Sequence, residues 1–201
     1  MLADPGLQDT SDEDAARSSI YGLLARLLLR PQQVPLGWLA SVDVGGDAHD
    51  PLSLTWSGLV AASRAGPQAL HDAHAALFIA PGTPAINPYA SWYRDGALMN
   101  TSLADLRSDL RELGLQRAKD ARETEDHLGA LCETMQQLIL RGEPVETQAQ
   151  FLRAHVLPWA SRCLADIAEH PRAGLYAAAA AFATAFLASE DEALVQGETT
   201  A

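Results

Sequence analysis

The stretch Arg122-Glu123-Thr124-Glu125-Asp126-His127-Leu128 leads into Gly129-Ala130-Leu131-Cys132-Glu133-Thr134-Met135, and the two together read as the start of a helix over 122–141. Thr124 is expected at the N-cap, where its hydroxyl accepts a backbone N–H of the first turn. The two acids that follow it would then stabilise the positive end of the helix dipole. Apolar residues continue at helical spacing, namely Leu128, Leu131, Met135, Leu138 and Ile139. The sequence therefore predicts a packed helix here.

A helix cap does not account for His127, which follows Asp126 directly. An imidazolium is disfavoured at the positive end of a helix dipole. The Asp126-His127 pair therefore suggests a recognition site in addition to a helix start.

The rest of the chain also predicts helices. No run of alternating β-branched and aromatic residues occurs, and no Asn-Gly or Asp-Gly turn joins two such runs. Helices are expected over 13–30, 50–66, 67–79, 101–113, 122–141, from 144 onward with a kink at Pro158, and from Pro171 to about Ala188. We predict an all-α fold, a single bundle of about six to eight helices with a central hinge. Residues 1–11 are expected to form a flexible leader, and 12–201 the helical domain, with Gly45-Gly46 in a separating segment.

Residues 80–93 form a Pro-rich loop, because three prolines and a glycine prevent a continuous helix there. The loop carries Ile86, Tyr89, Trp92 and Tyr93, and three exposed aromatic rings together would form a sticky patch. Two compatible interpretations follow: the loop packs on the core, or it lines a binding groove.

The charge of the chain limits its partners. Its 201 residues hold 26 acids, 14 bases and a net charge of −12, and Lys119 is the single lysine. Nucleic acid is excluded as a partner because phosphates require a basic surface. A cationic partner is favoured, since the field of the whole protein attracts it.

The termini and cysteines predict a cytoplasmic protein. Residues 1–14 have neither a basic region nor an apolar core of a secretion signal. The longest apolar run, 175–188, is too short to span a membrane, so no membrane insertion is expected. Cys132 and Cys163 lie in separate helical patterns, which is typical of buried thiols in a reducing compartment.

Catalytic and cofactor motifs are missing from the sequence. It contains no phosphate-binding loop, no dinucleotide fingerprint, no H-E-x-x-H and no nucleophile elbow. His71 and His74 share a helix face but lack a third ligand, so neither a metal nor a cofactor is predicted. Asp126 and His127 lack an identifiable nucleophile, and adjacent helical residues point about 100° apart. We predict no enzyme; a small enzyme or nucleotide-binding protein using this pair is one alternative, and a helical scaffold without a peptide site is another.

A collinear set of features spans about Ile20 to Glu190. It comprises Leu77-Phe78, Pro88-Tyr89, Ser91, Tyr93, Leu98-Met99, Arg107, Gly114-Leu115, Glu123-x-Glu125-Asp126-His127-Leu128, Glu133, Met135, Phe151-Leu152-x-x-His155-x-x-Pro158-Trp159, Tyr176 and Phe186-Leu187. This series resembles the TorD/DmsD family of redox-enzyme maturation chaperones, which is related to the NarJ-type chaperones. The family signature reads Glu-Pro-x-Asp-His, and Thr124 stands here in place of its proline.

The resemblance implies a cytoplasmic chaperone for a molybdenum-cofactor oxidoreductase. Such a chaperone binds the twin-arginine signal peptide, delays export and keeps the apo form of the enzyme competent for cofactor insertion. It acts as a monomer or a domain-swapped dimer, with a hinge near 95–122 between its N- and C-terminal halves. The matching site residues are Pro88, Tyr89, Ser91, Tyr93, Asp126 and His127.

Physical reasoning adds three residues to this site. A twin-arginine signal has a basic region followed by an apolar region. Glu123 and Glu125 supply carboxylates for the guanidinium groups, and Trp92 adds apolar surface beside Leu98.

Overall fold

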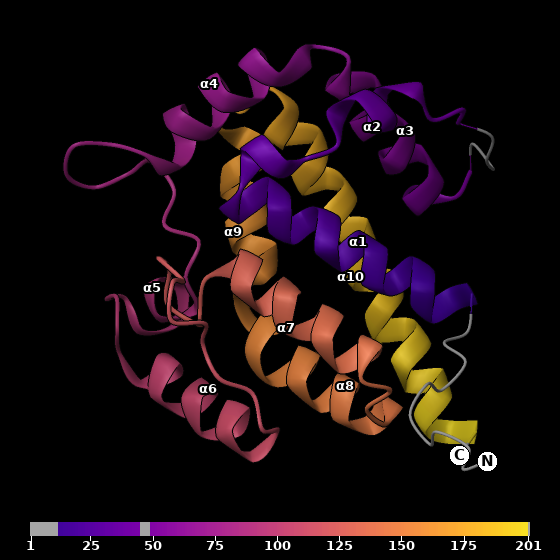
Figure 1. Cartoon of the computed structure of the whole chain (residues 1–201), viewed down its shortest axis with the longest axis vertical. Helices are drawn as coiled ribbons and strands as arrows, with labels where there is room; N and C mark the ends of the chain where they lie inside the picture. The colour runs from indigo at the N-terminus through magenta and orange to yellow at the C-terminus, as the bar shows by residue number, and fades with distance from the viewer. Residues whose placement is uncertain (1–11, 45–48, 201) are drawn as a thin grey trace, which may run out of the picture.

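All regular structure in the described residues of the computed structural model, 12–44 and 49–200, is helical apart from one isolated β-bridge (Figure 1). The helices are α1 (Asp12–Leu29), α2 (Leu36–Ser41), α3 (Pro51–Ser63), α4 (Gly66–Phe78), α5 (Ala90–Asp95), α6 (Thr101–Glu112), α7 (Leu128–Leu140), α8 (Val145–Phe151), α9 (Leu157–Glu169) and α10 (Leu175–Thr200). A 3₁₀ turn (η1, Pro31–Gln33) follows α1, and a π-helical turn (Leu152–Val156) joins α8 to α9. The predicted all-α class is confirmed. The expected leader over 1–11 and the Gly45-Gly46 separator lie outside the described residues.

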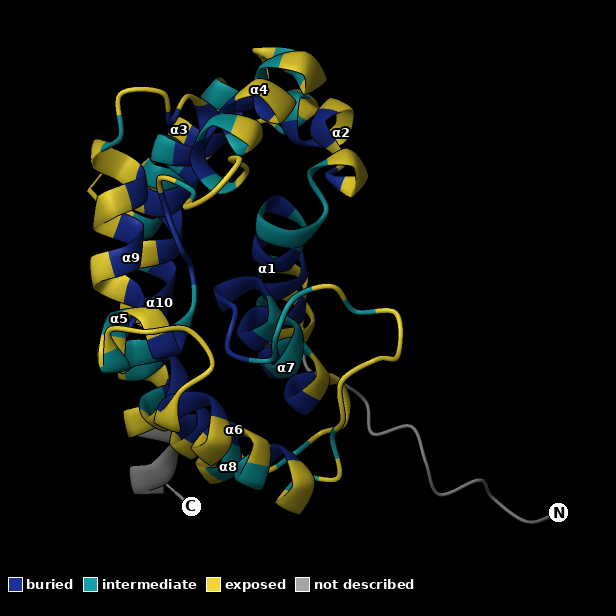
Figure 2. Cartoon of the chain, turned by 90° about the vertical axis from the view of Figure 1, so that its left-hand side faces the viewer, coloured by how far each residue is buried: buried dark blue, intermediate teal, exposed yellow. Residues whose placement is uncertain are grey.

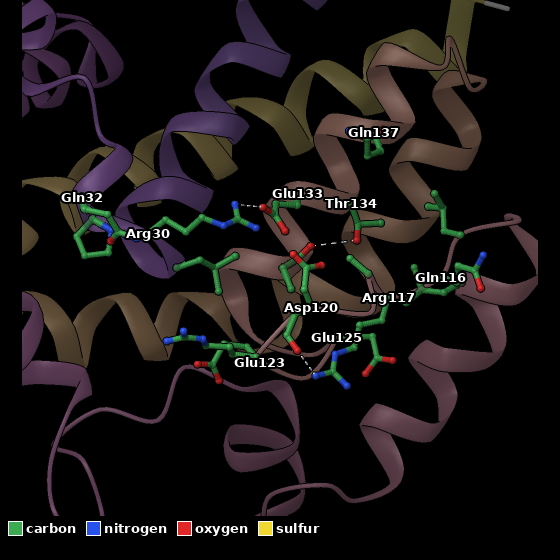
Figure 3. A pocket seen from close by; sticks show the side chains of 18 of the residues that line it. Arg30, Gln32, Gln116, Arg117, Asp120, Glu123, Glu125, Glu133, Thr134 and Gln137 are labelled. Atoms are coloured by element: carbon green, nitrogen blue, oxygen red, sulfur yellow. Dashed lines mark hydrogen bonds and ion pairs between the residues drawn. The ribbon is translucent and has the colours of Figure 1, made fainter.

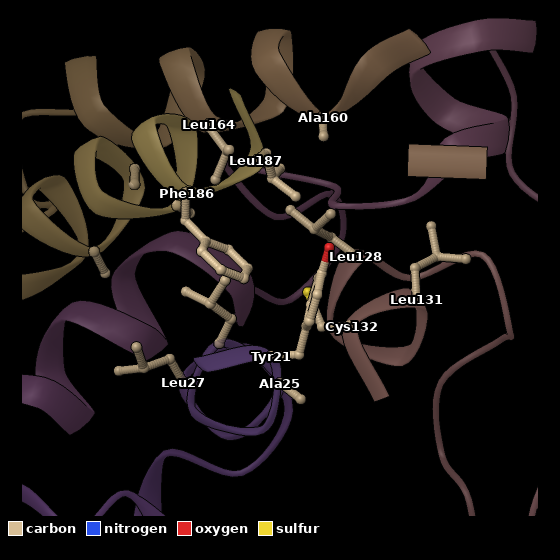
Figure 4. Close-up of a cluster of buried hydrophobic side chains, with 14 of the residues drawn as sticks. Tyr21, Ala25, Leu27, Leu128, Leu131, Cys132, Ala160, Leu164, Phe186 and Leu187 are labelled. Atoms are coloured by element: carbon tan, nitrogen blue, oxygen red, sulfur yellow. The ribbon is translucent and has the colours of Figure 1, made fainter. Parts of the chain in front are cut away.

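Two central helices, α1 and α7, pack side by side, and α9 and α10 cover them. In Figure 4 the rings of Tyr21 and Phe186 meet beside Cys132 and Leu164. The two ring centroids lie 4.9 Å apart at an interplanar angle of 73°. Both cysteines, Cys132 and Cys163, are buried and unbridged, as the sequence predicted.

The helix boundaries follow local signals where such signals exist. The Asp50 carboxylate accepts the Leu52 and Ser53 N–H groups at 3.3 and 2.9 Å, and Pro51 occupies the first helical position, as predicted. Gly114 ends α6 in the left-handed region, with φ 65°, also as predicted. The short helices α2 and α5 were not predicted, because six residues hold too few turns to show a period.

The last helix is longer than the predicted end at Ala188. Glu190 accepts the Arg17 Nε and Nη2 donors at 2.8 and 3.0 Å, and Leu194 is buried. A long-range ion pair and an apolar contact therefore extend α10 to Thr200.

The chain departs from α-helical geometry just before Pro158, where a kink was predicted. Proline has no N–H to donate to the carbonyl four residues earlier, which is that of Ala154. That carbonyl accepts the Arg94 Nη1 donor at 3.0 Å instead. Over Leu152–Val156 the helix widens into the π-helical turn, in which the Leu157 N–H bonds to the Leu152 carbonyl. The predicted interruption is confirmed in this form.

The segments that pack in the interior of the fold differ in solvent exposure from the connection between α6 and α7. Residues 21–25 of α1 are buried and the segment 86–91 is mostly buried, whereas the 115–125 connection is intermediate or exposed (Figure 2). No helix among the described residues is long and apolar enough to cross a membrane.

The tight packing of α1 on α7 predicts a stability effect at Gly129. A Cβ there would lie 2.7 Å from Leu29 Cγ and 3.1 Å from Leu28 Cβ. Gly129→Ala should therefore lower the free energy of unfolding by about 1–3 kcal/mol, as overpacking does. Urea denaturation measures the change.

Gly58→Ala is the matched control. Gly58 lies inside α3, and a Cβ there meets nothing within 4 Å. This change should stabilise the protein by up to about 1 kcal/mol through helix propensity. Equal shifts in the two variants would show that α1 and α7 do not constrain Gly129.

Candidate functional site

The segments 88–90 and 126–128 are joined by backbone hydrogen bonds. The Ala90 N–H donates to the Asp126 carbonyl at 2.9 Å, and the Leu128 N–H donates to the Pro88 carbonyl at 2.8 Å. Tyr89 and His127 form the antiparallel bridge between them, with ring centroids 5.0 Å apart and an interplanar angle of 85°. The structure therefore brings the loop and the acidic stretch together.

The side chain of Asp126 reinforces this pairing. Asp126 is fully buried, and its Oδ2 accepts the Ser91 N–H at 3.0 Å and the Ser91 hydroxyl at 2.6 Å. Its Oδ1 accepts the Thr124 hydroxyl at 2.6 Å. The Ser91 Oγ in turn accepts the Met99 N–H at 3.2 Å. The buried carboxylate thus joins Ser91 to the 124–126 segment, and Ser91 extends the network to Met99.

The predicted N-cap at Thr124 is wrong. Helix α7 begins at Leu128, and its N-cap is His127, whose Nδ1 accepts the Gly129 N–H at 3.0 Å. The backbone at His127 is extended because it pairs with the 88–90 segment, so the helix cannot begin earlier. Glu125 and Asp126 consequently lie before the first turn of α7 and not within it.

His127 is held in its neutral form. Burial lowers the pKa of His127 to about 4, although the nearby charges of Glu123 and Asp126 act in the opposite direction. A nitrogen that accepts the Gly129 N–H cannot carry a proton, so the geometry and the pKa agree.

Tyr89, Glu123 and Glu125 form polar contacts at the edge of this pairing. The Tyr89 hydroxyl donates to the Glu123 carboxylate, and burial together with this carboxylate raises the pKa of Tyr89. Glu125 Oε2 accepts from Arg107 Nε at 3.1 Å and Nη2 at 2.9 Å. Burial alone would raise the pKa of Glu125, but the hydrogen bond and charge of Arg107 outweigh it and lower that pKa.

A cleft of about 860 Å³ lies on the outer side of Glu123 and Glu125 (Figure 3). One side of the cleft is formed by residues 29–32, at the end of α1 and in η1, and by the end of α4. The other side is formed by α7 and the 115–125 connection. Four carboxylates line it: Asp120, Glu123, Glu125 and Glu133. Three arginines also line it: Arg30, Arg117 and Arg122. Apolar walls come from Leu29, Ile79, Leu110 and Leu115.

Most of these cleft residues were not predicted from the sequence. Glu133 lies on α7, and its carboxylate binds Arg30 Nη1 at 2.5 Å, near the end of α1. Their separation of 103 residues leaves no sequence signal for this contact. Among the nine predicted site residues, only Glu123 and Glu125 line the cleft.

The aromatic residues of the predicted loop divide into two groups. Tyr93 packs on α9, where its ring stacks on Trp159 with centroids 5.6 Å apart and its hydroxyl donates to Asp166 at 2.6 Å. Trp92, Leu98 and Met99 are 40%, 45% and 75% exposed. Tyr93 therefore contacts the core, whereas Trp92 and two nearby residues expose apolar side chains. We call Trp92, Leu98 and Met99 the Trp92 patch.

The two histidines considered as metal ligands do not combine into a metal site. His74 Nε2 lies 3.3 Å from the Leu28 carbonyl, and its ring packs on Phe78 and Tyr176. Within the described residues, no group of three or more His, Cys, Asp or Glu side chains is arranged to hold a metal ion.

Comparison with known proteins places the chain in a family. Residues 47–165 match the family model described as the nitrate reductase delta subunit. The chain is 30% identical over 194 residues to the chaperone protein TorD of Salmonella bongori, covering 88% of this chain and 89% of that protein. The chain belongs to the TorD/DmsD family.

Other TorD/DmsD relatives match shorter parts of the chain. The Tat proofreading chaperone DmsD of Salmonella paratyphi A is 36% identical over 109 residues, covering 52% of this chain and 53% of that protein. A chaperone protein TorD of Vibrio cholerae is 29% identical over 129 residues, or 59% of each chain. At the position of the proline in the TorD/DmsD signature, Thr124 gives Asp126 a hydrogen-bond donor that proline lacks.

The buried contacts of Asp126 predict a large stability effect. In Asp126→Asn the side chain would lose its charge and one of its two acceptor oxygens, although all three present contacts are hydrogen bonds donated to the carboxylate. The free energy of unfolding should fall by about 2–3 kcal/mol, the worth of hydrogen bonds to a charged group. Asp120→Asn, at an exposed carboxylate, is the control and should change it by less than about 0.5 kcal/mol. A loss below about 1 kcal/mol at Asp126 would fit only a helix-dipole effect.

The depressed pKa of His127 predicts a pH dependence of stability. Between about pH 6.5 and pH 4 the unfolded chain binds a proton at this ring and the folded protein does not, so stability falls as the pH falls. His127→Asn keeps an acceptor for the Gly129 N–H and removes the ionisation. Across this range the variant should lose about 2–3 kcal/mol less stability than the wild type, at 1.36 kcal/mol for each pKa unit. Parallel curves in urea denaturation at several pH values would contradict the neutral buried ring.

Proposed function

We propose that this protein is a cytoplasmic, non-enzymatic chaperone that binds the twin-arginine signal peptide of a molybdenum-cofactor oxidoreductase. It assists maturation of the apo form and cofactor insertion before export. The relatives named as the chaperone TorD and the Tat proofreading chaperone DmsD support this role. The observation that carries the proposal is the cleft along Glu123 and Glu125, because it combines carboxylates with apolar walls.

The basic region of the signal peptide suits the cleft. Four carboxylates line the cleft, and the chain as a whole carries a net charge of −12. Guanidinium groups form paired, charge-assisted hydrogen bonds with carboxylates. The long-range field increases the rate at which a cationic peptide encounters the surface.

The apolar region of the signal peptide suits the Trp92 patch. Trp92, Leu98 and Met99, which lie within eight residues of one another in the sequence, all expose apolar side chains. Ser91 connects this patch to the stretch containing the two glutamates, since it bonds both Met99 and Asp126.

The proposed site residues have two kinds of role. Glu123, Glu125 and Trp92 are the ones that contact the peptide, because they line the cleft or are exposed. The others position the backbone that carries them: Pro88, Tyr89, Ser91, Tyr93, Asp126 and His127.

The contacts of Asp126 and His127 favour a structural role over acid–base chemistry. The Asp126 carboxylate accepts three hydrogen bonds from Ser91 and Thr124, and the acceptor nitrogen of His127 is occupied by the Gly129 N–H. Both side chains are buried. These contacts support a chaperone rather than an enzyme or nucleotide-binding protein using this pair.

The segment 95–122 remains our candidate hinge between an N-terminal and a C-terminal half. Few polar contacts fasten α6 to the body, and they include Arg107 to Glu125 and His155 Nε2 to Asp109 Oδ2 at 2.7 Å. A hinge here permits either a monomer or a domain-swapped dimer.

Peptide binding tests the proposal directly. A synthetic leader with two adjacent arginines before an apolar run of leucine and alanine should bind the full chain in calorimetry. Replacing both arginines with alanine should weaken binding at least about tenfold, which corresponds to the loss of one charge-assisted hydrogen bond. Raising the salt concentration should weaken binding of the arginine peptide more, because salt screens the ion pairs.

A control peptide with the arginines intact and serines in place of the leucines tests the apolar half. Equal affinity for the arginine and alanine leaders would rule out the acidic cleft as the binding site. Equal affinity for the leucine and serine leaders would rule out the Trp92 patch.

A further inference from the structure

Two carboxylates of the cleft are already bound by arginines of the same chain. Glu125 accepts two hydrogen bonds from Arg107 on α6, and Glu133 accepts one from Arg30, next to the end of α1. Figure 3 shows the Arg30 side chain extended toward Glu133. Two of the four cleft carboxylates are therefore already paired with guanidinium groups, each supplied by an element outside the 122–135 stretch.

Releasing the two arginines into solvent costs less free energy than leaving their carboxylate partners unpaired. The Arg107 and Arg30 side chains are 47% and 43% exposed, so water solvates their charges when they leave. The Glu125 side chain is only 14% exposed, and an unpaired charge in that position is costly. Exchange of one guanidinium for another keeps Glu125 paired throughout.

We propose that Glu125 and Glu133 are the acceptors for the two arginines of the signal peptide, and that Arg107 and Arg30 occupy these acceptors until the peptide replaces them. The inference rests on the proposed function. It adds Glu133 to the site and assigns Arg107 and Arg30 as internal competitors that lower the affinity of the empty cleft.

Competition of this kind has a direct consequence for binding. The wild type gives up two internal ion pairs to form two with the peptide, and this loss offsets part of the binding free energy that the peptide arginines contribute. A variant without Arg107 gains an ion pair on binding. That variant should therefore bind more tightly, and its affinity should depend more steeply on salt.

Calorimetry with the same arginine leader tests the competition. Arg107→Gln should bind it about two- to fivefold more tightly than the wild type, which is the range for an exposed ion pair. Arg111→Gln is the matched control, because Arg111 lies one turn further along α6 and its Nε bonds the Arg107 carbonyl rather than a cleft carboxylate. It makes the same change in net charge and should tighten binding less than Arg107→Gln.

Three further variants test the individual contacts. Arg107→Lys keeps the charge but cannot donate from two nitrogens in a fixed fork, so its affinity should lie between those of the wild type and Arg107→Gln. Arg30→Gln should tighten binding independently of Arg107. Glu133→Gln should weaken binding of the arginine leader and leave that of the alanine leader unchanged. Thermal melting of each variant checks that it is folded.

The outcomes distinguish this inference from the proposed function. If the wild type binds the arginine leader, and Arg107→Gln binds it no more tightly than Arg111→Gln does, the competition is wrong and the proposed function stands. If Glu133→Gln binds both leaders as the wild type does, the second acceptor is wrong. If the wild type binds no arginine leader, the proposed function fails and the inference fails with it.

Discussion

The buried carboxylate of Asp126 is the contact on which the arrangement of this chain depends. Removing a charge from water costs several kcal/mol, and in this structure three donors from Ser91 and Thr124 offset that cost. Two of these donors belong to Ser91, so the loop cannot move away from the 124–126 segment without removing two of the three hydrogen bonds to the buried carboxylate. The backbone pairing of 88–90 with 126–128 supports the same arrangement. The start of α7 and the end of the Pro-rich loop thus behave as one structural unit.

This unit determines which acids of the central stretch are available to a ligand. Thr124 and Asp126 bond each other and face the Pro-rich loop, whereas Glu123 and Glu125 line the cleft. Carboxylates that are close in sequence therefore differ in role: one holds the backbone, and the others remain at the surface. A substitution that loosens Asp126 would also displace its neighbours. Reduced peptide binding in such a variant is then no proof that Asp126 touches the peptide.

The sequence predicted correctly those features that depend on interactions between residues close together in the chain. The apolar periods of the long helices, the Asp50-Pro51 helix start and the interruption at Pro158 all follow from residues within a few turns. The N-cap at Thr124 was predicted wrongly because pairing with residues 88–90, far away in the sequence, prevails over a local capping preference. The cleft was missed for a related reason. Its carboxylates and arginines come from α1, α7 and the 115–125 connection, and only the folded chain brings them together. The family resemblance found the loop and the Asp-His pair, but could not show which of their side chains are buried.

The π-helical turn before Pro158 has a consequence for how the length of this chain can vary. A π turn adds one residue to an α-helix without breaking it, and each residue of an α-helix turns the chain by about 100°. Deleting one residue from Leu152–Val156 would remove the extra residue of the π turn and rotate α8 relative to α9. Gln148 on α8, which accepts a hydrogen bond from Arg17 at 2.9 Å, would then face another direction. In homologous chains, a gap at this point would signal a reoriented α8 even where the flanking residues are identical.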